Sequence, residues 1–157
     1  MRFPLEVFEA MRTVWPKDRA LGIRVSATDY VEGGWDLEQT IAFAKELKAR
    51  GCDFIDASGG GLHPSQKIEL KPGYQVPFAE AIRRETGLPT MAVGLIDKPE
   101  HADELVATGK ADMIAMARAF LFDPHWVWHA AEALGEPGAP AYPPQYKRSH
   151  AMFLNRK

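Results

Sequence analysis

The stretch DLEQTIAFAKELKARGCDFIDA, residues 36–57, contains one helix followed at once by one buried strand. Apolar residues recur at helical spacing at Leu37, Ile41, Ala44 and Leu47. Asp36, with Gln39 three residues later, matches a capping box, and Gly51 fits the position after the last turn. The short apolar run at 54–57 then predicts a buried strand.

The same alternation of helix and strand continues in both directions along the chain. Apolar runs predict further strands at 21–25, 89–93 and 113–116. Helical spacing predicts helices at 5–14, 36–50, 78–85, 99–108, 119–122 and 125–134. The strands start at intervals typical of βα units, and their lack of polar alternation predicts a parallel sheet covered on both faces. A half barrel and a small doubly wound sheet both fit this pattern.

Length and composition restrict the fold and the partners. The chain has 157 residues, which suits one domain, whereas a barrel of eight βα units needs roughly 250. A net charge of -2 without a dense basic run argues against nucleic acid, and no apolar run approaches the roughly 20 residues of a membrane span. Its one cysteine, Cys52, excludes an internal disulfide, and the histidines form no metal signature. The N-terminus lacks a signal-peptide pattern, so we expect a cytoplasmic protein without metal.

Two residues that follow the last two predicted strands suggest a phosphate site. Gly94 follows the strand at 89–93, and Arg118 follows the strand at 113–116 and begins helix-like sequence. In parallel βα folds, such loops meet at one edge of the sheet, where backbone N–H groups and a helix start favour an anion. The alternative is that Gly94 only turns the chain and Arg118 is a solvated residue at a helix start.

Two other strand ends carry candidate ligand-binding residues. Arg24 lies inside an apolar strand, where a guanidinium is unfavourable unless it is paired. It either faces an anionic or electron-rich ligand or forms a buried ion pair with an acid such as Asp56. The glycine-rich run at 58–61 has neither Walker nor dinucleotide-binding spacing, so a flexible rim of the site is the better interpretation.

Several motifs together resemble the Old Yellow Enzyme family, most closely its bacterial ene-reductase and xenobiotic-reductase branch. They are RFPLEVF at 2–8, IRVSA at 23–27, PGYQVPF at 72–78, and ADMIA at 111–115 followed by Ala117 and Arg118. The resemblance covers essentially the whole chain in the right order. It implies an α/β fold: the C-terminal half of a TIM (β/α)8 barrel, with four βα units that correspond to strands five to eight. Residues 1–135 form the half barrel, and residues 136–157 form a tail.

The resemblance also implies a cofactor and roles for particular residues. In that family FMN lies at the barrel mouth, is reduced by NADPH or NADH, and passes hydride to an alkene conjugated to a carbonyl or nitro group. Arg24 corresponds to the arginine near the pyrimidine edge of the flavin. Gly94, Ala117 and Arg118 correspond to the phosphate-binding residues. Where the family commonly has Gly-Arg, this chain has Ala117 before Arg118, which preserves the backbone N–H if the local φ is negative.

Two further implications concern what the chain lacks and what it associates with. No catalytic residue is assigned, because the histidine pair that holds the substrate and the proton-donating tyrosine belong to the missing half. Arg148, in the tail, resembles an arginine that reaches the active site of a neighbouring subunit. We therefore expect a homo-oligomer or a complementary N-terminal half, with a small molecule as substrate. The rival hypotheses are a non-catalytic half-barrel assembly module and another phosphate-binding barrel enzyme.

Overall fold

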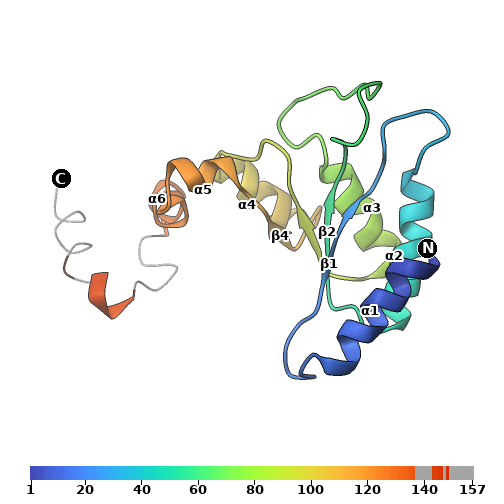
Figure 1. Cartoon of the computed structure of the whole chain (residues 1–157). Helices are drawn as coiled ribbons and strands as arrows, with labels where there is room; N and C mark the ends of the chain where they lie inside the picture. Colours follow the sequence, from blue (N-terminus) through green and yellow to red (C-terminus); the bar gives the residue numbers. More distant parts are fainter. Residues whose placement is uncertain (137–142, 147, 149–157) are drawn as a thin grey trace.

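The computed structural model describes residues 1–136, 143–146 and 148, and within them helices and strands alternate along the chain (Figure 1). The strands are β1 (Ile23–Ser26), β2 (Ile55–Ser58), β3 (Thr90–Ala92) and β4 (Met113–Ile114). The helices are α1 (Arg2–Val14), α2 (Leu37–Ala49), α3 (Val76–Thr86), α4 (Pro99–Ala107), α5 (Arg118–Phe122) and α6 (Trp126–Ala133), with a short 3-10 helix η1 at Pro144–Tyr146. Most of the predicted tail at 136–157 lies outside the described residues.

The four strands form one parallel sheet in the order β1-β2-β3-β4. Each crossover therefore moves in the same direction, and right-handed crossovers of that kind place every helix on the same face. A doubly wound sheet would need its strand order to reverse. The topology thus decides between the two predicted architectures, and the fold is part of a (β/α)8 barrel. That its strands are strands five to eight stays a prediction.

The stretch at 36–57 folds as its sequence predicts. Asp36 accepts a hydrogen bond from the Gln39 N–H at 2.8 Å, and the Gln39 side chain accepts one from the Asp36 N–H at 3.1 Å. These two bonds satisfy backbone donors that the first turn of a helix leaves unpaired, so the predicted capping box is confirmed. The chain then turns at Gly51, which has a φ of 81°, and enters β2.

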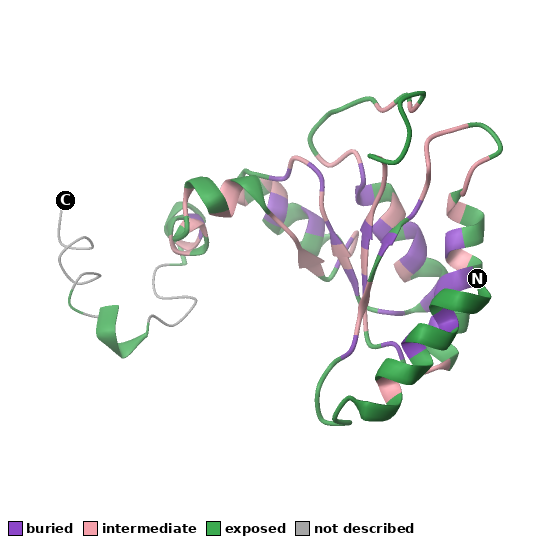
Figure 2. Cartoon of the chain, in the orientation of Figure 1, coloured by how far each residue is buried: buried purple, intermediate pink, exposed green. Residues whose placement is uncertain are grey.

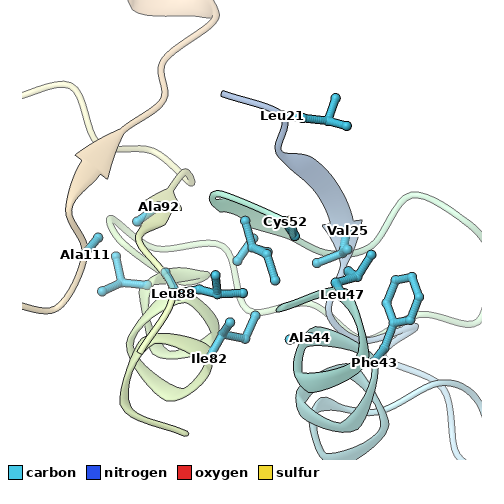
Figure 3. Close-up of a cluster of buried hydrophobic side chains, with 14 of the residues drawn as sticks. Leu21, Val25, Phe43, Ala44, Leu47, Cys52, Ile82, Leu88, Ala92 and Ala111 are labelled. Carbon is cyan, nitrogen blue, oxygen red and sulfur yellow. The ribbon is translucent and has the colours of Figure 1, made fainter. Parts of the chain in front are cut away.

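The core lies between the sheet and its helices. Leu47 of α2, Ile55 of β2 and Ile82 of α3 are fully buried and belong to one cluster. Figure 3 shows side chains of α2 and α3 pointing toward Val25 and Ala92 of the sheet. Removing this apolar surface from water, at about 25 cal/mol per Å², is the main force that holds the helices on the sheet.

The prediction that both faces of the sheet are covered is wrong. Burial alternates along β1 and β2 (Figure 2). Every second residue, on the face away from the helices, is exposed or intermediate. The Arg24 side chain is one of them and is 55% exposed, although an apolar strand was expected to bury it. In a closed barrel, side chains from the remaining strands fill this inner face. A partial barrel has only some of those strands, so the face stays open.

Asp112, just before β4, connects the start of that strand to β3 and α3. Its carboxylate accepts hydrogen bonds from Arg83 Nε at 3.0 Å and from the Thr90 N–H at 2.9 Å. The Arg83 bond is the main reason why the pKa of Asp112 lies below its ordinary value of 3.8, and the Thr90 bond lowers it further. The ionised carboxylate is therefore more favourable in the folded chain than in the unfolded chain.

A depressed carboxyl pKa contributes stability that is present above the unfolded pKa and is lost as the pH falls through the folded pKa. We expect Asp112→Asn to unfold at lower urea concentration than the parent at pH 7. The difference should shrink as the pH falls below about 4, near the unfolded pKa of aspartate. Urea titrations at several pH values measure this. A constant difference across the range would mean that the charge of Asp112 does not stabilise the fold.

No helix in the described part of the chain has both the length and the apolar character that crossing a membrane requires.

Candidate functional site

The loops after β3 and β4 meet at one edge of the sheet. Both strands are parallel, so Gly94, which follows β3, and Arg118, which follows β4, lie at the same carboxyl-terminal edge. A pocket of about 560 Å³ forms there, lined by Leu95, Ile96 and Asp97 from the first loop and by Ala117 and Arg118 from the second. The phosphate hypothesis requires Gly94 and Arg118 to lie at the same edge of the sheet, and they do.

The turn at Gly94 has a backbone that favours glycine. Its φ is 127°, and Leu95, the next residue, has a φ of 54°. The Gly73 N–H donates to the Gly94 carbonyl at 2.8 Å and holds the turn from outside the pocket. A Cβ at Gly94 would lie 3.1 Å from the Tyr74 ring and 3.2 Å from Gln75 Nε2. Gly94 therefore allows a close backbone approach, although its neighbours in the sequence, not Gly94 itself, line the pocket.

Ala117 and Arg118 begin the short helix α5 on the other side of the pocket. Ala117 stands where the family commonly has glycine, and its replacement was expected to be tolerated if the local φ is negative. The φ of Ala117 is −109°, which an alanine adopts without strain. The Arg118 side chain forms no salt bridge with another described residue. Its guanidinium is therefore available for an anion in the pocket.

Two carboxylates also line this pocket, and sequence reasoning did not identify either of them. Asp123 accepts hydrogen bonds from the His125 N–H at 3.0 Å and lies 2.6 Å from His129 Nδ1. The His129 contact is the main reason why the pKa of Asp123 lies below its ordinary value. Asp97 is also one of the lining residues, and its carbonyl accepts a hydrogen bond from Trp126 Nε1 at 3.0 Å. An anion in the pocket therefore needs Arg118 and backbone N–H groups to outweigh these two charges.

Arg24 lies outside this pocket. It is on β1, at the far side of the sheet from β4, and lines a separate groove of about 310 Å³ with Trp35 and Phe43. Its Nη1 donates to Asp56 Oδ2 at 2.6 Å, so the ion pair that was one of the two interpretations of Arg24 is present. The Arg24 side chain is 55% exposed, so the pair is not the fully buried one that was predicted.

The glycine-rich run at 58–61 was predicted to form a rim of the site rather than a phosphate-binding loop. The Gly61 N–H is already bound by Gln66 Oε1 at 2.7 Å, so the chain itself occupies a donor that a phosphate would need. Tyr30 packs edge to face on Phe78 beside this run, with a φ of 54° and a buried hydroxyl that has no partner among the described residues. Burial raises the pKa of Tyr30. Its location directly after β1 was the only sequence signal for it.

Arg148 is exposed, and residues 147 and 149 on either side of it lie outside the described residues. Its predicted contact with a neighbouring subunit stays a prediction.

The residues around the pocket fit a phosphate group such as that of FMN. The cationic side chain of Arg118, the glycine turn and the negative φ of Ala117 match what an anion at the end of parallel strands requires. The pocket is concave and combines apolar side chains with these polar groups, as small-molecule sites do.

Comparisons with known proteins identify the family. The chain matches the NADH:flavin oxidoreductase / NADH oxidase family over residues 1–136. It is 45% identical over 134 residues to an NADPH dehydrogenase of Geobacillus sp. (strain WCH70), covering 85% of this chain and 38% of that protein. It is 44% identical over 144 residues to an NADPH dehydrogenase of Listeria innocua serovar 6a, covering 92% of this chain and 41% of that protein. The chain thus spans about two fifths of the length of these curated relatives.

Solved structures support the fold. A 2-naphthoyl-CoA reductase in complex with 2-naphthoyl-CoA has a TM-score of 0.74 and 27% identity, covering 87% of this chain and 21% of its own. A histamine dehydrogenase from Rhizobium sp. 4-9 has a TM-score of 0.68 and 24% identity, covering 86% of this chain and 20% of its own. At this identity it supports the fold alone. The partial coverage agrees with a partial barrel. The chain therefore belongs to the NADH:flavin oxidoreductase / NADH oxidase family, which implies FMN as cofactor, as the resemblance predicted.

Proposed function

We propose that this chain is the FMN-phosphate-binding part of an oxidoreductase that uses NADH or NADPH to reduce activated alkenes such as enones and nitroalkenes. The observation that carries the proposal is the meeting of Arg118 and the Gly94 turn around one pocket, in a chain of a flavin-dependent family. FMN, when bound, supplies hydride transfer, and the protein supplies its position and its electrostatic surroundings.

Each candidate residue then has a defined task. Arg118 donates charge-assisted hydrogen bonds to the phosphate, and the backbone N–H groups near Gly94 and Ala117 add further donors. Arg24 presents positive charge on the open face of β1. Neighbouring strands lie about 4.8 Å apart, so β1 and β4 are separated by about 14 Å. A ligand that contacts both must have the length of a flavin nucleotide rather than of a sugar phosphate.

Binding of FMN to the purified chain tests this proposal. We expect FMN fluorescence to be quenched on titration with the chain, and riboflavin, which lacks the phosphate, to bind more weakly. Equal affinity for the two flavins would remove the phosphate site. Displacement of FMN by low concentrations of a sugar phosphate would favour another phosphate-binding barrel enzyme. Absence of FMN binding at high protein concentration would favour the assembly module.

Catalysis by this chain alone is not expected, because no group on it is assigned to hold the substrate or donate a proton. We propose that another polypeptide, either a complementary half barrel or a second copy, covers the open edges at β1 and β4. Exposed apolar side chains lie beside both edges. They are Phe3, Val7, Met11 and Val14 on α1 and Leu121 and Phe122 on α5. Edges and apolar surface of this kind are sites of association in parallel sheets.

Replacing Phe3 and Val14 together by serine is expected to lower the association of the chain. Their side chains are 75% and 81% exposed, so the change removes apolar surface without opening the core. Leu70→Ser, at a residue 68% exposed in the loop before α3, is the matched control. Sedimentation velocity over a range of concentrations measures the mass. An unchanged mass in the double variant would mean that this side of α1 is not an interface.

A further inference from the structure

In the described part of the chain, the Arg24 guanidinium has one hydrogen-bond partner, Asp56. The two residues face each other in register across β1 and β2, and Arg24 Nη1 lies 2.6 Å from Asp56 Oδ2. β1 is an edge strand of the described sheet, so there is no neighbouring strand on its other side to supply a second partner. Asp56 is therefore the group that fixes the orientation of the guanidinium.

The two members of the pair differ in their exposure. The Asp56 side chain is 14% exposed, whereas the Arg24 side chain is 55% exposed. Asp56 Oδ1 is buried and accepts no hydrogen bond from any described residue, so Arg24 is the donor that the carboxylate uses. A long, largely exposed side chain samples many rotamers in water. The buried carboxylate selects one of them, because a charge-assisted hydrogen bond is strong and directional.

We propose that Asp56 is a positioning residue that holds the Arg24 guanidinium in place on the open face of the sheet. The proposal rests on the proposed function, in which Arg24 faces bound FMN. The reduced form of FMN carries more negative charge than the oxidised form, so a cation beside it raises the reduction potential. A preorganised cation does this more effectively than a mobile one, because it needs no reorientation when charge develops.

The test measures the effect of Arg24→Ala on the potential of FMN bound to the full chain, in three backgrounds: parent, Asp56→Asn and Asp56→Ala. Asparagine retains an oxygen that accepts from Arg24, and alanine does not. In the parent and in the Asp56→Asn background, loss of Arg24 should weaken binding of reduced relative to oxidised FMN about tenfold, a drop of about 30 mV for two electrons. In the Asp56→Ala background the drop should be less than a third of that. An equal drop in all three backgrounds would show that Arg24 needs no positioning by Asp56.

A second measurement requires no FMN. Phenylglyoxal modifies accessible guanidinium groups, and mass spectrometry of proteolytic peptides gives the rate at Arg24. We expect modification to be several-fold faster in Asp56→Ala than in the parent and unchanged in Asp56→Asn. The same rate in all three chains would overturn the proposal. If the parent chain binds no FMN, the proposed function fails, and this rate still decides whether Asp56 positions Arg24. Asp56→Val, which also lacks an acceptor oxygen and suits a strand, replaces the alanine variant should the latter not fold.

Discussion

Arg118→Ala is expected to weaken FMN binding by about 10- to 100-fold. Hydrogen bonds to charged groups contribute about 1.5–3 kcal/mol, and about 1.4 kcal/mol corresponds to a factor of ten in affinity. Arg118 lines the pocket and forms no salt bridge with any other described residue, so its loss removes a ligand contact and breaks no internal pair. Asp97 and Asp123, which also line the pocket, would then have less positive charge nearby to offset their negative charge.

Fluorescence titration with FMN and with riboflavin measures this effect. Riboflavin affinity should be nearly unchanged in Arg118→Ala, because the lost contact is to the phosphate. Arg84→Ala is the matched control, since Arg84 is an exposed arginine of α3 whose ion pair within the described part of the chain is with its neighbour Glu85. Arg118→Lys should lie between the parent and Arg118→Ala, because lysine keeps the charge and loses the two-pronged geometry. Equal FMN affinity in Arg118→Ala and the parent would exclude Arg118 from the phosphate site.

The elements that the sequence predicts well are those whose signals are local. The capping box of Asp36 and Gln39 and the apolar spacing of α2 depend on residues within a few turns of one another, and both are present. The helix predicted at 5–14 begins earlier, at Arg2, and the strand predicted at 113–116 is only Met113–Ile114. Such end points depend on packing and hydrogen bonds that periodicity does not contain.

The features that could not be predicted depend on which strands lie side by side. The exposure of Arg24 follows from the open inner face, which an apolar strand sequence does not indicate. The sequence left Arg24 between a ligand contact and an ion pair with Asp56, and only the register of β1 and β2 places the two side chains together. Asp123 was missed although its partners are local. Apolar periodicity does not indicate that its carboxylate meets the His125 N–H and the His129 ring, two and six residues later.

Gly94→Ala is expected to reduce FMN affinity about 5- to 100-fold. A φ of 127° is unfavourable for a residue with a side chain, and holding one there costs about 1–3 kcal/mol. The added Cβ would also lie 3.1 Å from the Tyr74 ring and 3.2 Å from Gln75 Nε2, and Gln75 is buried. The turn is expected to relieve this strain by changing its backbone. The backbone N–H groups that we propose to bind the phosphate would then change their direction.

Gly61→Ala separates this effect from the general cost of a side chain at positive φ. Gly61 has a φ of 84°, and a Cβ there meets nothing within 4 Å. Both substitutions therefore strain the backbone, but only the change at Gly94 alters the turn beside Arg118. Thermal melts should show a loss of melting temperature in both variants, larger for Gly94→Ala because of its added contacts. FMN titrations should show a clear loss of affinity for Gly94→Ala and little change for Gly61→Ala. If both variants bound FMN like the parent, the loop after β3 would not hold the phosphate, and Arg118 would have to bind it from the β4 side alone.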